Sequence, residues 1–309
     1  MKIKTCLVLG GNGFIGKNLL KTLLVHEFMV SSFDVSVPSE KLDNVRYIAG
    51  DFTDDDTIKS LVQKYDVIIH LISTITPRLS MQKPIQGYSV DVLQAFKILE
   101  TLKGTNTSVI FASSGGTVYG QPEKVPVSER HLIAPIVHYG IVKATIEQLL
   151  LMYNKVYGMN NKVMRISNPY GPGQDYKKGV GIINALLRNA LDRETTTIWG
   201  DGTAVKDYIY IDDLCEYICR YIEYSGNAQV LNIGSGIGNS INELINIVQK
   251  LTDKKLDITF ESAIQNDIHN IVLDVNKAQK ELGYTPKYSI ISGIKKYIEE
   301  TQKNIFGSL

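Results

Sequence analysis

Residues 5–16 read TCLVLGGNGFIG: an apolar run ends in a glycine-rich turn, and an amphipathic segment follows it. This pattern predicts a strand, a phosphate-binding loop and a helix. Gly10 and Gly13 permit a turn that a Cβ atom would strain, and Gly16 lets the helix pack closely on the strand. The N–H groups at the helix start, with the helix dipole, can then hold a pyrophosphate. The residues expected there are Gly10, Gly13, Phe14, Ile15 and Gly16; a purely structural glycine turn is the alternative.

An acidic residue closes the next predicted strand, residues 28–33. It is Asp34, 24 residues after Gly10. A carboxylate there accepts both hydrogens of an adenosine ribose diol and repels a 2′-phosphate. No Arg or Lys lies between Asp34 and Lys41 to bind such a phosphate. The sequence therefore favours NAD over NADP, and a turn role for Asp34 ahead of Pro38 is the plainer alternative.

The composition excludes several classes of protein. The chain has 309 residues, of which 44% are apolar, with 33 basic and 32 acidic side chains. This near-neutral balance gives no electrostatic footprint for nucleic acid or an anionic membrane. Cys6, Cys215 and Cys219 indicate neither a disulfide framework nor a metal site. We see no signal-like or membrane-spanning apolar run, so we expect a cytoplasmic protein without membrane insertion.

Strand-like runs alternate with helical patterns, which predicts an α/β fold: a Rossmann-type, doubly wound parallel sheet with helices on both faces. The further strands are expected at residues 45–49, 66–71, 108–112, 162–166 and 229–233, and helices at 55–64, 87–103 and 139–157. We expect a NAD-binding domain at residues 1–167, with a later segment at about 206–236 interleaved. A smaller substrate lobe takes most of residues 168–309, because Gly, Pro and Asn become dense from Asn168 onward.

One pair of side chains suggests acid–base chemistry. Tyr139 and Lys143 are one helical turn apart, so the ammonium can lie beside the phenol and hold its proton loosely. A tyrosine ordinarily titrates near pH ~10, and a neighbouring cation makes it a useful base at neutral pH. The spacing itself is common by chance. Its place, at a helix start roughly 25 residues after a predicted strand, is what supports a catalytic role.

Further motifs continue almost to the C-terminus. They are GDF at 50–52, HLIS at 70–73, SSGGTVYG at 113–120, RISNPYGPGQ at 165–174, WGDG at 199–202, KDYIYIDD at 206–213, NIGSG at 232–236 and ELGYTPKYSI at 281–290. With the glycine loop, Asp34 and the Tyr139–Lys143 pair, they resemble the extended short-chain dehydrogenase/reductase family. The resemblance is to its NAD-dependent nucleotide-sugar epimerase/dehydratase branch, and within it to UDP-glucose 4-epimerases. The motifs are specific for the branch and much less specific for the substrate.

The resemblance implies positions for cofactor and substrate. Tyr139 would take the proton from the sugar 4-hydroxyl as hydride passes to NAD, while Lys143 binds the nicotinamide ribose and lowers the pKa of Tyr139. Asn168 would contact the sugar diphosphate, and Trp199 would pack near the nucleobase. A core or lobe-interface role for Trp199 is an equal alternative. The remaining cofactor contacts implied are Asp34 at the adenosine ribose, Asp51 and Phe52 beside the adenine, and Leu71 and Ser73 along the cofactor.

The catalytic stretch departs from the family. Relatives usually place Ser or Thr, which relays the proton, where this chain has Gly115. Ser114 or Thr117 can substitute, and strand alternation favours Thr117 because residues 115 and 117 would share a face. Residues 115–117 contain no acid for the extra proton transfer of dehydratases and decarboxylases, which argues against both reactions. An Asn usual in the preceding helix is Asp91, which puts that cofactor contact in question.

The diphosphate site departs as well. Lys206 stands where relatives place Arg, and residues 263–267 contain no Arg where one would clamp the diphosphate. A weaker clamp or an unusual sugar donor follows. The cations that could compensate are Arg78, Lys177, Lys178 and Arg188, each also an ordinary surface charge.

These residues lead us to expect NAD-dependent C4 epimerisation of a nucleotide sugar, a UDP-hexose or UDP-N-acetylhexosamine, through a transient 4-keto intermediate. The alternatives are an NAD(P)H-dependent 4-keto-sugar reductase and a non-catalytic NAD-binding protein. We also expect a homodimer, because two predicted helices are apolar over more than one stripe and the equivalent helices form a two-fold interface in this family. The residues concerned are Val90, Leu93, Phe96 and Ile98, and Ile146, Leu149, Leu150 and Met152.

Overall fold

The strand that the glycine motif predicts is β1, Thr5–Leu9, near the middle of the main sheet. The computed structural model describes residues 4–174, 181–192, 194–263 and 267–306. Cys6 and Val8 of β1 enter one hydrophobic core, whereas Leu7 and Leu9 enter another. Successive strand residues point to opposite faces, so a strand buried on both faces is apolar at every position. This is why the opening run shows no polar alternation.

β1 belongs to a sheet of seven parallel strands with the order β10-β6-β5-β4-β1-β2-β3. The other strands are β2 Met29–Asp34, β3 Val45–Ala49, β4 Val67–His70, β5 Ser108–Ser114, β6 Lys162–Ile166 and β10 Val230–Ile233. The order grows outward from β1 in both directions, and ligands bind at such a switch point. The predicted doubly wound parallel sheet is confirmed.

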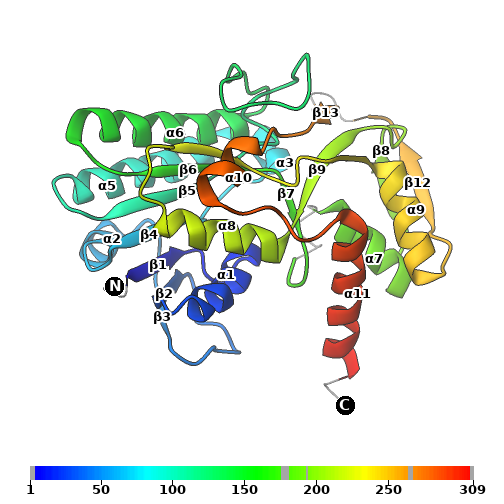
Figure 1. Ribbon diagram of the computed structural model, residues 1–309, viewed down its shortest axis with the longest axis horizontal. Coiled ribbons are helices and arrows are strands. Elements are labelled where there is room, and N and C mark those ends of the chain that lie inside the picture. Colours follow the sequence, from blue (N-terminus) through cyan, green and yellow to red (C-terminus); the bar gives the residue numbers. More distant parts are fainter. Residues whose placement is uncertain (1–3, 175–180, 193, 264–266, 307–309) are drawn as a thin grey trace.

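Helices cover both faces of the sheet (Figure 1). One face carries α1 Phe14–Val25 and α8 Ile211–Glu223, and the other carries α2 Asp55–Val62, α5 Leu93–Leu102 and α6 His138–Tyr157. The short helices α3 Pro77–Gln82 and α4 Pro84–Gln86 come before α5. The helix predicted at 87–103 begins differently: Gly87–Val92 form a π-helical segment, η1. Such segments are rare and frequent at functional sites.

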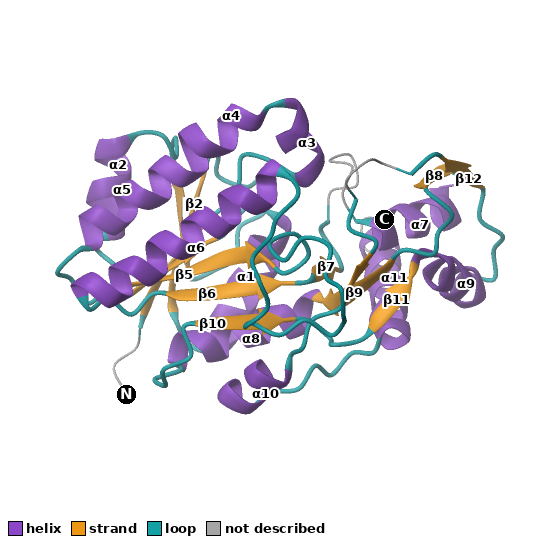
Figure 2. Cartoon of the chain, turned by 90° about the horizontal axis from the view of Figure 1, so that it is seen from above, coloured by secondary structure: helices purple, strands orange, loops and turns teal. Residues whose placement is uncertain are grey.

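The smaller lobe lies beyond the carboxyl ends of the sheet strands (Figure 2). Its central strand β9, Val205–Tyr210, pairs with β7, β11 and β13, and β8 pairs with β12. The elements are β7 Asn168–Tyr170, α7 Ile182–Asp192, β8 Thr196–Trp199, β11 Gly238–Ser240, α9 Ile241–Thr252, β12 Ile258–Glu261 and β13 Asn270–Ile271. The carboxyl edge of the sheet therefore faces the smaller lobe.

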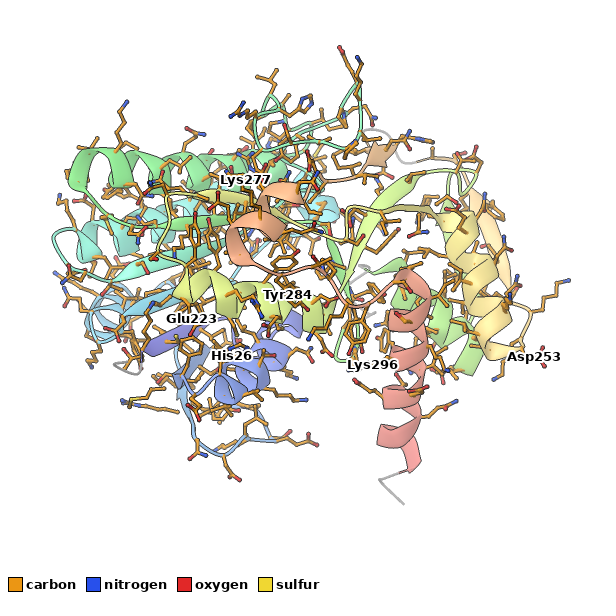
Figure 3. All side chains as sticks on the ribbon, in the orientation of Figure 1. His26, Glu223, Asp253, Lys277, Tyr284 and Lys296 are labelled. Atoms are coloured by element: carbon orange, nitrogen blue, oxygen red, sulfur yellow. The ribbon has the colours of Figure 1, made fainter. Side chains whose placement is uncertain are left out.

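The C-terminal segment joins the lobe to the sheet domain through α10, Asn276–Leu282, and α11, Ile290–Phe306. The Tyr284 hydroxyl donates to Asp213 Oδ1 at 2.6 Å, and Lys296 Nζ lies 2.7 Å from Asp212 Oδ2 (Figure 3). Both acids belong to the first turn of α8, where the helix dipole favours negative charge. Within the described ranges, no helix has both the length and the apolar character that a membrane span requires.

Candidate functional site

The glycine loop connects β1 to α1 at the carboxyl edge of the sheet. Gly10 has φ +91°, a conformation that side chains with a Cβ rarely adopt. A Cβ on Gly16 would lie 2.3 Å from Gly10 O, so glycine alone allows this approach of α1 to the loop. Gly11, which the sequence analysis did not single out, is equally restricted, since its Cβ would lie 1.9 Å from Ser32 Oγ.

Gly13 has an ordinary φ of −71°, but a Cβ there would lie 3.2 Å from Gly10 O, so the turn leaves little room for a side chain at this point. Gly13 is the residue just before α1, and no side chain in the described part of the chain caps that helix. The first N–H groups of a helix have no partner within it, so those of Phe14, Ile15 and Gly16 are directed at the loop's outer space. The loop therefore fits a pyrophosphate.

Asp34 is the last residue of β2 and not a turn residue. Its carboxylate accepts hydrogen bonds from Asn12 N–H at 2.9 Å and Val35 N–H at 2.8 Å. These bonds hold the carboxylate beside the glycine loop and leave lone pairs on both oxygens. Its position matches the requirement for binding a ribose diol.

The residues implied at the adenine come after β3. Asp51 is exposed and accepts the Thr53 N–H and hydroxyl, each at 2.8 Å, which holds the pKa of its carboxyl below the usual value. Phe52 is buried, and its ring centre lies 5.5 Å from that of His70. Burial, and then the Lys143 charge, lowers the pKa of His70 to about 3, so this imidazole is neutral. Asp51 thus stands at the rim, whereas Phe52 lies inside.

The loop after β4 is tied to η1. The Leu71 N–H still donates to Leu9 O at 3.0 Å, so the chain leaves the sheet after this residue. The Ser73 hydroxyl donates to Asp91 Oδ2 at 2.9 Å, and the Thr74 hydroxyl donates to Asp91 Oδ1 at 2.7 Å. The Asp91 carboxylate is buried, with 2% of the residue exposed. Asp91 therefore fixes the loop that carries Ser73.

Tyr139 and Lys143 come together near the start of α6. Lys143 Nζ donates to Ala112 O at 3.0 Å and lies 5.5 Å from the centre of the Tyr139 ring. Burial lowers the pKa of Lys143 to about 8. Burial, and then the Asp91 charge, raises the pKa of Tyr139. The net pKa of Tyr139 is thus raised by burial, and the lowering by Lys143 that the resemblance implies stays a prediction. The ammonium bonds to the β5 backbone and not to the phenol.

The sequence argument for Thr117 over Ser114 is wrong in its premise. Strand β5 ends at Ser114, and residues 115–119 form a turn in which the Thr117 N–H donates to Ser114 O at 3.2 Å. Strand alternation does not reach Thr117, so it cannot rank the two hydroxyls. Side chains alternate between the two faces only within a strand, and the backbone turns here before Thr117.

Gly115 does not open space for a ligand. A Cβ there would lie 2.6 Å from Leu273 Cδ1 and 3.0 Å from Arg165 O. The space beside Gly115 is filled by the Leu273 side chain, so the glycine leaves no extra room for a substrate.

The two hydroxyls beside Gly115 and Gly116 differ in their surroundings. Thr117 Oγ1 is buried and has no hydrogen-bond partner among the described residues. Thr117 O lies 2.8 Å from the place of a Cβ on Gly140, so this turn packs directly against the residue after Tyr139. Ser114 Oγ and Asn168 Oδ1 would each lie 3.9 Å from a Cβ on Gly116.

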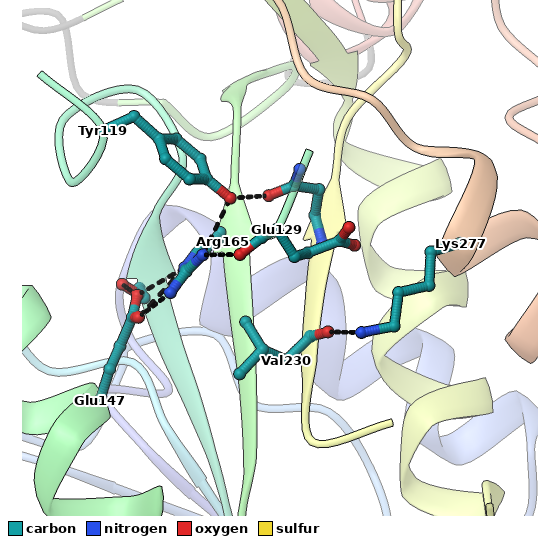
Figure 4. Close-up of polar contacts among 8 residues, drawn as sticks. Tyr119, Glu129, Glu147, Arg165, Val230 and Lys277 are labelled. Atoms are coloured by element: carbon teal, nitrogen blue, oxygen red, sulfur yellow. Dashed lines mark hydrogen bonds and ion pairs between the residues drawn. The ribbon is translucent and has the colours of Figure 1, made fainter. Parts of the chain in front are cut away.

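A buried ion pair between Arg165 and Glu147 connects β6 to α6 (Figure 4). Arg165 Nη2 lies 2.7 Å from Glu147 Oε2, and Arg165 Nη1 donates to the Tyr119 hydroxyl at 3.0 Å. Glu147 also accepts the Ser113 hydroxyl, beside Ser114. The sequence analysis missed this network. A signal was present, because Glu147 lies one turn after Lys143 on α6, where an unpaired acid would be costly.

The lobe supplies the implied substrate residues. Asn168 Nδ2 donates to Asp207 O at 2.9 Å, which orients the amide. Trp199 is 42% exposed, so it is not a core residue. The Arg78 guanidinium carbon lies 6.0 Å from its ring centre and connects α3 to β8.

The cations expected near a diphosphate are mostly engaged elsewhere. Lys206 Nζ donates to Ile268 O and lies 3.4 Å from Asp267 Oδ1, and burial lowers its pKa. Arg188 pairs with Asp192 at 2.5 Å on α7. Lys177 and Lys178, like residues 264–266, lie outside the described residues. Arg78, which comes from the sheet domain, contacts the lobe at Trp199, whereas Lys206 and Arg188 are residues of the lobe itself.

Comparison with known proteins agrees with this geometry. The family model for the NAD-dependent epimerase/dehydratase family matches residues 6–234. The chain belongs to that family. NAD is therefore its cofactor, as the glycine loop and Asp34 predict.

Individual relatives span nearly the whole chain. It is 32% identical over 304 residues to a dTDP-4-dehydro-6-deoxyglucose reductase of Escherichia coli, covering 95% of this chain and 96% of that one. It is 30% identical over 303 residues to a UDP-glucose 4-epimerase of Mycolicibacterium smegmatis, covering 95% and 97%. The solved structure of MoeE5 with UDP-glucuronic acid and NAD is similar with a TM-score of 0.90 and 28% identity, covering 97% of this chain and 99% of that one.

Proposed function

We propose that this protein is an NAD-dependent C4 epimerase of a nucleotide sugar, a UDP-hexose or UDP-N-acetylhexosamine. The observation that carries the proposal is the Tyr139–Lys143 pair, with a 5.5 Å separation of ammonium and ring centre. The turn that carries the unpartnered Thr117 hydroxyl packs through its backbone on Gly140, the residue after Tyr139. These groups lie at the carboxyl edge of the same sheet that holds the glycine loop. A substrate between sheet and lobe would reach both.

Tyr139 is the proposed acid and base at the sugar O4. Bound NAD supplies a hydride acceptor and donor at C4. The Tyr139 phenol takes the O4 proton and later returns it, which needs a phenolate whose formation the apolar surroundings oppose. The Lys143 ammonium lies over the same ring and stabilises a negative charge there. Ser114 or Thr117 would hold O4 in line with the phenol.

The absence of an acid in the residue 115–117 turn favours simple epimerisation. A dehydration or decarboxylation needs a further proton transfer, and a carboxylate near the sugar ring usually performs it. Asp91 does not serve, because Ser73 and Thr74 occupy its oxygens and it is buried. The same residues suffice for proton transfer at O4 alone.

The nucleotide part would lie against Trp199 and Asn168. The half-exposed Trp199 ring offers a stacking surface, and the oriented Asn168 amide offers a polar contact. The pairing of Lys206 with Asp267 leaves little net positive charge for the diphosphate. We therefore expect weaker diphosphate binding than an Arg clamp would give.

A 4-keto-sugar reductase is the second candidate. It is supported by the 32% identity to a dTDP-4-dehydro-6-deoxyglucose reductase. The same Tyr139 and Lys143 would serve, with the phenol donating a proton to the 4-keto oxygen. The two activities differ in the cofactor, since a reductase must release NAD and bind a reduced nucleotide in each cycle.

The cofactor of the purified protein separates the two activities. An epimerase retains NAD through gel filtration and interconverts UDP-glucose and UDP-galactose, or the N-acetylated pair, with no added nucleotide. A protein that loses its cofactor and consumes NADH or NADPH only with a 4-keto sugar would overturn the proposal in favour of the reductase.

A further inference from the structure

Asp91 is a buried carboxylate that the proposed reaction does not use. Its carboxylate accepts the Ser73 hydroxyl, the Thr74 hydroxyl at 2.7 Å and the Thr74 N–H at 3.0 Å. Each of these groups donates to Asp91, and one donor is a backbone N–H that cannot act as an acceptor. A neutral amide would satisfy the same loop with fewer acceptor sites, so the hydrogen bonds alone do not require a charge.

The negative charge of Asp91 acts electrostatically on Tyr139 and Lys143. Asp91 raises the pKa of Lys143 and of Tyr139, in each case after the larger effect of burial. The side chain comes from η1, which packs directly on α6: a Cβ on Gly87 would lie 2.9 Å from Val142 Cγ2. Asp91 therefore belongs to a segment that packs on α6, the helix that carries Lys143, and its buried carboxylate is held at the loop after β4.

The position of Asp91 along the sheet decides which half of the cofactor feels it. In a doubly wound sheet the two nucleotide halves bind on opposite sides of the switch point. The Gly10 loop and Asp34 belong to the β1–β2 side, where the adenosine half lies. The loop of Ser73 follows β4, and Lys143 bonds to β5, so Asp91 is on the side of the nicotinamide half.

We propose that the Asp91 charge makes this site prefer the oxidised cofactor over the reduced one. The oxidised nicotinamide ring carries a positive charge and the reduced ring carries none, so a buried negative charge near it favours the oxidised form. Two unit charges about 10 Å apart at an effective dielectric of ~20 change an equilibrium by roughly tenfold. The consequence for turnover rests on the proposed function: in an epimerase, this preference favours the return of hydride to the 4-keto sugar.

The test uses the cofactor alone and needs no sugar. The dissociation constants of NAD and NADH are measured by calorimetry on protein freed of nucleotide, for the wild type and for Asp91→Asn. We expect the preference for NAD over NADH to fall about tenfold in Asp91→Asn. An unchanged ratio would overturn the proposal, whether or not the protein proves to be an epimerase.

Two controls separate charge from structure. Asp34→Ala should weaken NAD and NADH equally, because Asp34 faces the adenosine half that both share. Thr74→Val removes one hydrogen bond to Asp91 and keeps its charge, so the ratio should stay as in the wild type. A Thr74→Val ratio that falls like that of Asp91→Asn would show that loop order, not charge, sets the preference. Asp91→Ser removes the charge in a smaller side chain if Asp91→Asn does not fold.

Discussion

The Lys143 ammonium lies 5.5 Å from the centre of the Tyr139 ring while its hydrogen bond goes to Ala112 O at 3.0 Å. The cation is thus held by β5 and not by the phenol. Its burial costs free energy, which is why the pKa of Lys143 is lowered to about 8. This arrangement connects the stability of the protein to the readiness of its reacting pair.

Replacing Lys143 by Met should stabilise the cofactor-free protein near neutral pH. The unfolded lysine titrates near ~10.4 and the folded one near 8, so the folded protein disfavours the ammonium. The wild type therefore gains stability as pH rises from about 8 to about 10.4, at about 1.4 kcal/mol per tenfold difference in proton affinity. Below pH 8 the difference between variant and wild type is largest.

Melting temperatures of both proteins at pH 7 and at pH 9.5 measure this effect. We expect the advantage of Lys143→Met to shrink at the higher pH. An advantage that grows with pH would contradict the assigned direction of the Lys143 pKa.

Asp34→Ala should weaken NAD and relax the discrimination against NADP. The Asp34 carboxylate is held beside the glycine loop by the Asn12 N–H. The adenosine ribose is expected to bind at this place. Its removal deletes two acceptors and one repelling charge. Titration of both nucleotides decides the matter, and an unchanged NAD/NADP affinity ratio counts against the assignment.

Thr117→Val and Ser114→Ala identify the hydroxyl at O4. Thr117→Val keeps the side-chain shape and deletes the buried, unpartnered Oγ1, so we expect turnover to fall roughly ten- to a thousand-fold, the range of one positioned hydrogen bond or proton relay. Ser114→Ala should reduce turnover less, because it is the Thr117 turn that packs on Gly140, next to Tyr139. If the two effects are reversed, Ser114 is the relay. If both variants stay active, the phenol works alone or through water.

We propose that α5 and α6 form a homodimer interface. Leu93 and Phe96 of α5 and Ile141 and Met152 of α6 are exposed by 38–42%, which leaves an apolar surface on two neighbouring helices. Light scattering over a range of concentrations should give twice the chain mass. Leu93→Glu should shift the mass towards a monomer, and a monomeric wild type at every concentration would refute the interface.

Not every apolar residue of those helices contributes to such a surface. Ile98, Ile146 and Leu150 pack in the core beneath the sheet. The broad apolar surface predicted for these two helices is therefore made of an exposed stripe and a buried stripe.

The sequence predicted what depends on neighbouring residues. The glycine loop, Asp34 at the end of β2 and the one-turn spacing of Tyr139 and Lys143 are local patterns, and the structure places each as expected. The contacts that were not predicted join distant parts of the chain. Leu273 fills the space beside Gly115, and no local pattern relates these two residues.

The same reason explains two other differences. The ion pair of Lys206 with Asp267 and the hydrogen bond of Ser73 to Asp91 depend on how strands and loops come together in space. The turn after Ser114 was missed because strand alternation was extended across Gly115 and Gly116, a glycine pair that favours a turn. The places of the candidate residues on strands, loops and helices could be predicted, whereas their hydrogen-bond partners and burial required the fold.

The central claim is that Tyr139 moves the O4 proton while the bound cofactor exchanges hydride with C4. The most direct measurement follows UDP-galactose carrying deuterium at C4, by NMR, with purified protein and no added nucleotide. We predict UDP-glucose that keeps the deuterium at C4, and a loss of turnover by orders of magnitude in Tyr139→Phe with NAD binding retained. Near-normal turnover in Tyr139→Phe, or a product that has lost its deuterium, would contradict the account.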